Sequence, residues 1–173
     1  YAATQANIPF ISIKVTGFAR FSLLEKIDAS MHTLEGTLMK RYLKAVMLLS
    51  TDEKKEWHRV RLRMLQVCAG ADKKNIGVLV DAEETWIQDP VDALTLLMID
   101  TFNKTKAVVF NTMQMYRHDR LQFLKDSYTA AQERNFILGA KLVRGAYMDK
   151  ERARAAEMNY PSPIQPDKES CDK

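Results

Sequence analysis

Charged and amide side chains stand in or directly after four apolar runs of this 173-residue chain, and they are the residues best suited to chemistry. Lys14 and Lys141 each interrupt an apolar run, Asp81 ends another, and Asn111 and Gln114 follow a third. A buried ammonium without a partner costs several kcal/mol, so the two lysines favour a polar cavity. A carboxylate can hold such cations, and amides can hydrogen-bond a planar heterocycle. This combination predicts a site for a polar ligand.

Each of these residues also has a purely structural explanation. A lysine near a strand end can extend its charged head into solvent, Asp81 can cap the turn after its strand, and the two amides suit loop capping equally well. If the site exists, we expect Asp81 to pair with Lys14 from a neighbouring strand. Glu83 and Glu84 are interpreted as solvated acids or as the start of a helix.

Arg144-Gly145-Ala146 follows the fourth apolar run and is suited to phosphate contact. Small residues let backbone N–H groups approach a phosphate, and the N-terminus of a following helix adds a partial positive charge. The tripeptide is neither G-x-G-x-x-G nor a Walker loop, so the standard dinucleotide and P-loop motifs lack their glycines here. The turn alone is therefore a weak indication of a phosphate site.

Other chemistries have little support in the sequence. His32, His58 and His118 are isolated from one another, so we expect no metal site. No G-x-S-x-G motif and no Cys–His arrangement indicates a covalent nucleophile. The charged stretch Tyr116–Arg120 is interpreted as the solvated start of a helix.

Short β-branched runs alternate with amphipathic stretches, which predicts a parallel α/β sheet. We expect strands at about residues 10–16, 76–81, 106–110 and 136–143. We expect helices at about residues 22–31 and 38–49, from the capping box Ser50–Glu53 onward, after Asp89-Pro90, after Asp119, and at about 149–158. Ligands of such sheets bind at the carboxyl ends of the strands, which is where the polar residues stand.

The composition excludes several classes of protein. Hydrophobic residues make up 46% and charged residues 28%, as in globular domains, and no apolar run approaches the ~20 residues of a membrane span. A net charge of +4 is too small and too scattered to indicate nucleic-acid binding. Cys68 and Cys171 are too few for a disulfide scaffold and fit a reducing compartment. The chain begins at Tyr1 without a Met and shows no signal peptide, so we expect a segment of a longer protein.

Four blocks of the sequence resemble the proline dehydrogenase (proline oxidase) family, in the same order along the chain. They are Ile11–Thr16, Val78–Glu84 with Trp86-Ile-Gln88, Phe110–Tyr116, and Gly139–Met148 with Glu151–Ala156. The last block is the most specific. The chain is most similar to the single-function enzymes of mitochondria and related bacteria.

The resemblance implies an α/β fold, a distorted (βα)8 barrel of the TIM type, that holds FAD noncovalently. It implies oxidation of L-proline to Δ1-pyrroline-5-carboxylate, the first step of proline catabolism, with hydride passing from the ring carbon beside nitrogen to the flavin N5. It further implies electron transfer to a membrane quinone and peripheral membrane association. The expected location is the mitochondrial matrix or inner membrane in a eukaryote, and the cytoplasm or inner membrane in a bacterium.

The resemblance also implies roles for individual residues. Asp81 is the expected active-site acid, and Lys141 is the basic group beside the flavin N5, where a cation stabilises the reduced ring. Lys14 is expected to line the proline site. Contacts with the cofactor are implied for Ala82, Asn111, Gln114, Lys141, Arg144, Gly145 and Ala146, the last three at the phosphate and ribose.

The length of the chain fits only part of such a barrel, which takes about 250 residues. We expect one partial domain over residues 1–173, about strands 2–5 of the barrel, with a helical insertion at about 31–70. A missing segment or a second chain is expected to complete it. The paired arginines that bind the substrate carboxylate in the family have no counterpart in the sequence. A non-catalytic fragment or pseudoenzyme, a hydroxyproline dehydrogenase, and a phosphate-binding barrel without flavin therefore remain alternatives.

Overall fold

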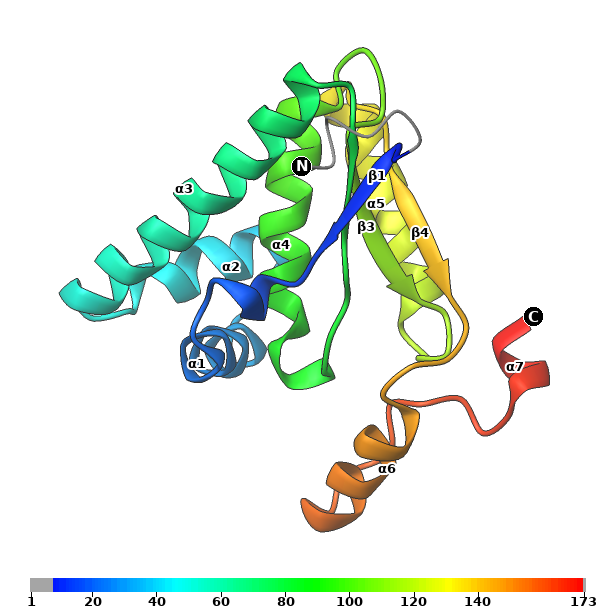
Figure 1. Cartoon of the computed structure of the whole chain (residues 1–173). Coiled ribbons are helices and arrows are strands. Elements are labelled where there is room, and N and C mark those ends of the chain that lie inside the picture. Colours follow the sequence, from blue (N-terminus) through cyan, green and yellow to red (C-terminus); the bar gives the residue numbers. More distant parts are fainter. Residues whose placement is uncertain (1–7, 173) are drawn as a thin grey trace.

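The computed structural model describes residues 8–172 and contains one four-stranded parallel sheet flanked by helices (Figure 1). The strands are β1 (Phe10–Ile13), β2 (Gly77–Val80), β3 (Val109–Gln114) and β4 (Ala140–Val143), and they lie side by side in chain order. All three pairings are parallel. The predicted parallel α/β fold is confirmed; the ends of the predicted domain, 1–7 and 173, lie outside the described residues.

The predicted strand ends were wrong at two places that matter for the site. β1 ends before Lys14, which stands between the strand and the short 3-10 helix η2 (Val15–Gly17). β3 runs through Asn111 to Gln114, so both amide residues belong to the strand and not to a loop after it. The apolar pattern missed this because the polar side chains of β3 find partners on other elements, which hold them in an extended, buried strand.

Three helices connect β1 to β2: α1 (Phe21–His32), α2 (Leu38–Met47) and α3 (Thr51–Lys73). The predicted capping box is present at the start of α3. The Ser50 hydroxyl accepts from the N–H of Glu53, and the Glu53 carboxylate accepts from the N–H of Ser50. Farther along α3, the buried indole of Trp57 donates to the Tyr42 hydroxyl of α2 at 2.9 Å. This bond fixes α3 against α2.

Helix α4 (Thr85–Phe102) begins well before the predicted cap at Asp89, and Pro90 lies inside the helix, so that prediction was wrong. The reason lies in a distant residue. The first N–H group of the helix, on Thr85, donates to the carboxylate of Glu151 at 2.7 Å. A cap from another element lets the helix start where no local capping side chain is present.

The remaining helices are α5 (Arg120–Arg134), α6 (Met148–Glu157) and α7 (Lys168–Asp172). α4 and α5 pack against β3 on one face of the sheet. In Figure 1, α1 to α4 lie to one side of the sheet, and α6 projects from the end at which the strands finish. No helix in residues 8–172 is both long enough and apolar enough to cross a bilayer.

The other face of the sheet is largely uncovered, and within the described residues β1 and β4 each pair with one strand only. On this face Phe10 packs edge-on against Phe110, with ring centroids 5.6 Å apart. A Cβ at Gly77 would lie 2.4 Å from the Phe10 ring, and one at Gly139 would lie 2.3 Å from the β3 backbone. The two glycines therefore leave room for the aromatic pair and for close approach of the neighbouring strand.

A buried ion pair joins α4 to α5 behind the sheet. Asp92 is fully buried, Arg120 is 4% exposed, and their side chains meet at 2.7 Å. Asp92 also accepts from Asn111 of β3 and from Gln88, each at 2.9 Å. The predicted solvated helix start is correct for His118 and Asp119, which are exposed just before α5, but it is wrong for the buried Tyr116, Arg117 and Arg120. Asp92, far away in the sequence, gives Arg120 a buried partner. Every buried side-chain nitrogen and oxygen in the described part of the chain has a hydrogen-bond partner.

Replacement of the buried arginine tests this arrangement. Arg120→Leu leaves Asp92 as an unpaired buried charge and is expected to lower the free energy of unfolding by about 3–5 kcal/mol. Arg134→Leu is the matched control, because Arg134 pairs with Asp100 but is half exposed, and its loss is expected to cost less than about 1 kcal/mol. Urea unfolding of both variants measures the difference. Equal losses of unfolding free energy in the two variants would show that Arg120 is not the buried partner of Asp92.

Candidate active site

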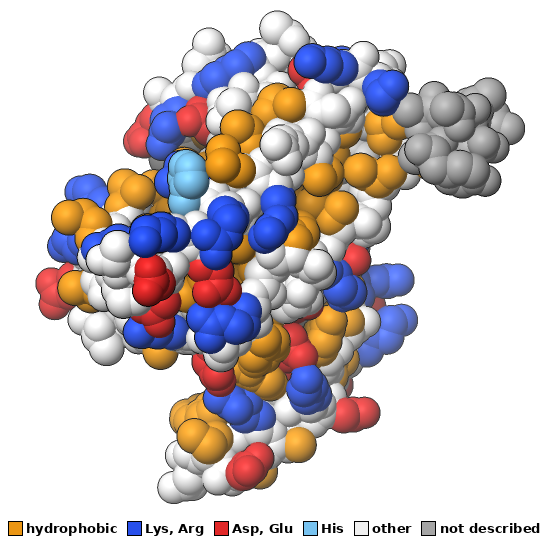
Figure 2. All heavy atoms as spheres, turned by 60° about the vertical axis from the view of Figure 1, so that its left-hand side comes forward, with side chains coloured by type: hydrophobic (Ala, Val, Ile, Leu, Met, Phe, Trp, Pro, Cys, Tyr) orange, Lys and Arg blue, Asp and Glu red, His pale blue; other side chains and the backbone are white. Residues whose placement is uncertain are grey.

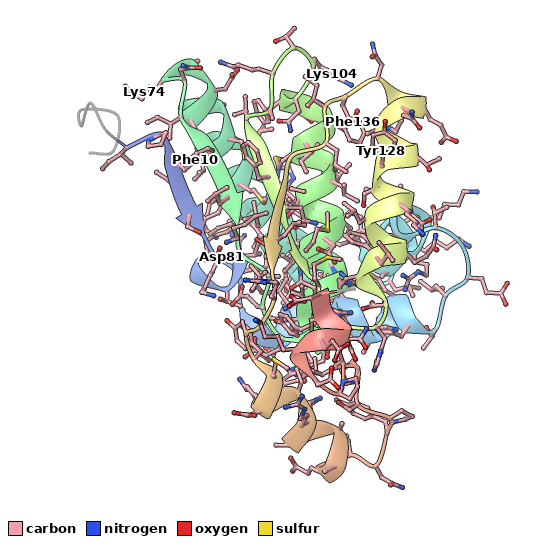
Figure 3. All side chains as sticks on the ribbon, turned by 90° about the vertical axis from the view of Figure 1, so that its right-hand side faces the viewer. Phe10, Lys74, Asp81, Lys104, Tyr128 and Phe136 are labelled. Atoms are coloured by element: carbon pink, nitrogen blue, oxygen red, sulfur yellow. The ribbon has the colours of Figure 1, made fainter. Side chains whose placement is uncertain are left out.

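A cavity of about 170 Å³ lies at the carboxyl ends of the strands. Figure 3 shows Asp81 toward this end of the sheet, whereas Phe10 and Lys74 lie toward the opposite end. The cavity lies where the strand order predicts a ligand site. Its lining comes from strand ends and the segments after them: Lys14, Asp81, Ala82, Thr112, Gln114, Tyr116, Lys141, Val143, Ala146 and Tyr147.

The register of the strands explains which side chains meet in the cavity. Thr112 of β3 is the register partner of Lys141 in β4. Asp81 follows Val80, whose partner in β3 is Asn111. Asp81, Thr112 and Lys141 therefore lie in one row across the sheet and on one face. Asn111 lies on the opposite face, fully buried against α4. The structure thus brings Asp81 and Lys141 together and separates Asn111 from them.

Asp81 and Lys141 form an ion pair in the cavity wall. The Ser12 hydroxyl donates to the same carboxylate oxygen at 2.8 Å. Burial acts to raise the pKa of Asp81, but the bonds from Lys141 and Ser12, with the charge of Lys14 nearby, hold that pKa below its usual value. Asp81 is therefore ionised at neutral pH. The predicted pairing of Asp81 with Lys14 was wrong, because Lys141 reaches the carboxylate from β4 across β3.

Lys14 interacts with Tyr147 instead. Its Nζ donates to the Tyr147 hydroxyl at 3.0 Å and lies 5.5 Å from the centre of that ring. This hydrogen bond raises the pKa of Lys14 and outweighs the opposite effect of partial burial, so the ammonium stays charged. Tyr147 has a left-handed backbone, with φ of 58°, which is rare for a residue with a Cβ. Strained residues of this kind cluster at functional sites.

Gln114 ends β3, and its amide is held by the protein on both sides. Nε2 donates to the Glu83 carbonyl at 2.7 Å and to the Tyr116 hydroxyl at 2.9 Å, and Oε1 accepts from Arg117 at 3.1 Å. Burial raises the pKa of Tyr116 to about 12, so its hydroxyl stays protonated. Gln114 is therefore a fixed part of the cavity wall.

The predicted phosphate turn lies at the rim of the cavity. Ala146 lines the cavity, whereas Arg144 and Gly145 do not. The Arg144 side chain is 66% exposed and pairs with Asp172 of α7 at 3.3 Å. The structure therefore brings one residue of the turn into the cavity and leaves the arginine at the surface.

Glu83 and Glu84 are both buried, so the prediction of solvated acids was wrong, although Glu84 directly precedes α4 as its alternative interpretation implied. Glu83 accepts two hydrogen bonds from Thr16, and Glu84 pairs with Lys150 of α6. The local sequence could not reveal this burial, because the partners come from the segments after β1 and β4.

Five residues in or beside the cavity wall were not predicted as site residues: Ser12, Thr112, Tyr116, Val143 and Tyr147. Ser12 and Thr112 share the face of Asp81, so the two-residue period of a strand could have found them once the strand ends were correct. Tyr147 lies in the block that resembles the family, but no charge or strand position distinguishes it.

The charges of the cavity lining indicate which kind of ligand the cavity can bind. The lining carries two ammonium groups against the single carboxylate of Asp81. A net positive cavity suits an anionic ligand, or a group that becomes anionic during a reaction. Within residues 8–172 no three His, Cys, Asp or Glu side chains gather closely enough to hold a metal ion.

Fold and site together define a protein of the parallel (βα)-barrel class, with a polar cavity at the carboxyl ends of the strands. Proline utilization A from Bdellovibrio bacteriovorus, inactivated by N-propargylglycine, aligns with a TM-score of 0.71 at 20% identity, over 95% of this chain and 15% of that chain. A bifunctional proline utilization A aligns with a TM-score of 0.70 at 18% identity, over 95% of this chain and 14% of that chain. At these identities the likeness shows the fold.

The family model for proline dehydrogenase matches residues 3–173, and the chain belongs to the proline dehydrogenase family. Mitochondrial proline dehydrogenase 1 of Drosophila melanogaster is 42% identical over 116 residues, which is 66% of this chain and 17% of that protein. Mitochondrial proline dehydrogenase 1 of Homo sapiens is 39% identical over 115 residues, which is 66% of this chain and 19% of that protein. Hydroxyproline dehydrogenase of Xenopus laevis is 28% identical over 182 residues, which is 99% of this chain and 39% of that protein. The chain thus spans 17% to 39% of the length of these relatives.

The lowered pKa of Asp81 leads to a pH-dependent prediction. Because the pKa is lower in the folded than in the unfolded chain, the ion pair adds stability above the unfolded value of 3.8, and this is lost as the pH falls through the lowered value. Asp81→Asn is expected to reduce the free energy of unfolding by about 1 kcal/mol at pH 7 and by less at pH 3. Urea unfolding at both pH values measures this, with the exposed Asp126→Asn as control. A loss that is the same at both pH values would contradict the assignment.

Proposed function

We propose that the full-length protein containing this chain is an FAD-dependent dehydrogenase that oxidises L-proline to Δ1-pyrroline-5-carboxylate. One observation carries the proposal: Lys14, Asp81 and Lys141 meet around one cavity at the strand ends, in a chain of the proline dehydrogenase family. FAD, when bound, supplies the acceptor for the hydride that leaves the ring carbon beside nitrogen.

The residues around the cavity fit a flavin. The ammonium groups of Lys14 and Lys141 suit a ring that gains negative charge on reduction. Ala82 and Ala146 extend no farther than Cβ, which leaves the cavity wall open to a flat ring. Gln114, whose amide is fixed by its neighbours, is proposed to complete this wall.

Two of the expected cofactor residues are given less direct roles. Asn111 faces away from the cavity, and its Oδ1 accepts from the N–H of Thr112 at 2.9 Å, so we propose that it supports the cavity wall from behind. Arg144 and Gly145 are exposed at the rim, and we propose that they contact the phosphates of FAD there.

The polar groups of the chain have distinct tasks in this proposal. Asp81 is ionised and holds the Lys141 ammonium over the cavity, so it orients a cation and does not supply a proton. Lys14, whose pKa is raised by the hydrogen bond to Tyr147, is a cation available to a carboxylate on the substrate. The substrate and the flavin are therefore proposed to occupy neighbouring parts of one positively charged hollow.

The chain contributes only part of the barrel in this proposal. Within the described residues, β1 and β4 have one free edge each, with unpaired backbone groups that can accept further strands. We propose that other strands of the full-length protein pair there. A second chain that supplies these strands is the alternative arrangement.

Replacement of Lys141 tests the catalytic assignment. In the full-length protein we expect flavin absorbance and proline-dependent reduction of a dye, and we expect Lys141→Met to lower kcat by about 10²–10³ because a charge-stabilising group is lost. Lys125→Met on α5, an exposed lysine, is the control and is expected to retain full activity. Absence of bound flavin in the full-length protein, or full activity of Lys141→Met, would end the proposal.

Two other functions remain to be separated from this one. The Xenopus laevis hydroxyproline dehydrogenase matches over 99% of this chain, which favours hydroxyproline as the second candidate substrate. A comparison of kcat/KM for the two amino acids in the full-length protein distinguishes them. Bound flavin without turnover of either amino acid would indicate a non-catalytic member of the family.

We also propose that electrons pass to a membrane quinone and that the surface of α2 and α3 contacts the membrane. On α2, Leu43 and Met47 are 53% and 73% exposed, beside Lys40 and Lys44. Residues 38–73 carry nine Lys and Arg against four Asp and Glu. Figure 2 shows basic and hydrophobic side chains interleaved on the side that bears these helices. Exposed aliphatic groups among cations suit an anionic lipid surface.

The names of the relatives support a proposal for the location. The Drosophila and human proteins are both mitochondrial by name. We propose the mitochondrial matrix or inner membrane if the source is a eukaryote, and the cytoplasm or inner membrane if it is a bacterium.

Sedimentation with liposomes tests the membrane surface. The double substitution of Leu43→Ser and Met47→Ser is expected to weaken binding of the full-length protein to anionic vesicles about tenfold, since two aliphatic side chains no longer enter the interface. Leu121→Ser on α5 removes a leucine that is also 50% exposed and is expected to have no effect. Undiminished binding of the double variant would exclude this surface.

A further inference from the structure

Two buried carboxylates each hold a threonine in the same way. Glu83 accepts from the backbone N–H of Thr16 at 3.2 Å and from its hydroxyl at 2.6 Å. Glu151 accepts from the N–H and the hydroxyl of Thr85, both at 2.7 Å. The two glutamates are only 4% and 1% exposed. We call these pairs the Glu83–Thr16 clamp and the Glu151–Thr85 clamp.

Each clamp fixes the backbone beside one residue of the cavity. Thr16 lies two residues after Lys14, within the short turn that begins there. Glu151 lies one helical turn after Tyr147, and its N–H donates to the Tyr147 carbonyl at 2.9 Å. The clamps therefore act on the two segments whose side chains meet at 3.0 Å.

Both clamps are anchored in one short segment, residues 83–85, between β2 and α4. The N–H of Glu83 donates to Gln88 and its carbonyl accepts from Gln114, each at 2.7 Å. Glu84, the next residue, pairs with Lys150 of α6. With its backbone held on both sides, this segment is a fixed reference for β1 and for α6.

The separation of β1 and β4 shows why the loops that follow them need a fixed anchor in residues 83–85. Lys14 follows β1 and Tyr147 follows β4, the two outer strands of the sheet. Neighbouring strands lie about 4.8 Å apart, so the outer strands of four are separated by about 14 Å along the sheet. The contact between the two side chains therefore depends on where the loops hold their backbones.

We propose that Glu83 and Glu151 are positioning residues that set the contact between Lys14 and Tyr147. The purpose of that contact, orientation of the substrate, rests on the proposed function; the geometry of the clamps does not. Loss of either threonine hydroxyl shifts its loop, lengthens the contact and removes the hydrogen bond that raises the pKa of Lys14.

The reactivity of the Lys14 amine tests the proposal without proline or turnover. Trace acetylation with acetic anhydride, quantified by mass spectrometry, reports the free amine of this exposed lysine in the full-length protein. Thr16→Val and Thr85→Val are each expected to raise Lys14 labelling about three- to tenfold, since a pKa lower by one unit is a tenfold increase in free amine. Tyr147→Phe leaves both clamps intact but removes the hydroxyl that Lys14 contacts, so it gives the Lys14 labelling expected when this contact is fully lost.

Three comparisons separate positioning from general damage. Thr16→Ser and Thr85→Ser keep the hydroxyls and are expected to restore the original labelling. Thr101→Val removes a hydroxyl at the far end of α4 that bonds only within the helix, and it is expected to leave labelling unchanged. In the active enzyme, the two clamp variants are expected to raise the KM for proline about tenfold with a smaller effect on kcat.

The outcomes are distinguishable. Labelling of Lys14 in Thr16→Val and Thr85→Val equal to that in Thr101→Val would overturn the proposal. If one of these variants does not fold, as judged by circular dichroism, the other decides, because each acts on a different loop. If labelling responds as expected but the full-length protein does not turn over proline, the clamps stand and the proposed function fails.

Discussion

The ion pair between Asp81 and Lys141 is the interaction on which the arrangement of the cavity depends, because it joins strands that are not neighbours. β3 lies between them, and the pair forms because the register puts both side chains in the same row as Thr112. A partly exposed pair of this kind contributes little to stability. Its effect is orientational: the carboxylate fixes an ammonium group over the cavity that would otherwise move freely in solvent.

A second set of polar contacts supports the same strand from behind. Asp92 receives hydrogen bonds from Arg120 and Asn111 on the face of β3 that is turned away from the cavity. A buried ion pair adds little net stability compared with apolar packing, but it allows few alternative arrangements. β3 is thus held by hydrogen bonds on both faces, which explains why a strand rich in polar residues is buried.

The sequence predicted what depends on local order along the chain, namely the alternation of strands and helices, the capping box at Ser50, and the grouping of Lys14, Asp81 and Lys141 at strand ends. It did not predict what depends on distant partners. The start of α4 is set by Glu151, and the burial of Arg120 is set by Asp92. The placement of Asn111 after its strand was wrong for a related reason. Once the strand extends over Asn111, the two-residue alternation puts its side chain on the face opposite Thr112, and an apolar pattern cannot locate the strand end when the residues near it are polar.

On the uncovered face of the sheet, apolar and polar side chains occupy opposite ends of the strands. Phe10 and Phe110 fill the end near the start of the strands, and Lys14, Asp81 and Lys141 occupy the end where the strands finish. Barrel interiors are filled by layers of side chains, so apolar packing here stops one layer below the cavity. The polar layer above it cannot be ordered by packing alone. Its geometry depends instead on hydrogen bonds from the loops, and the buried acids that follow β2 and β4 supply them.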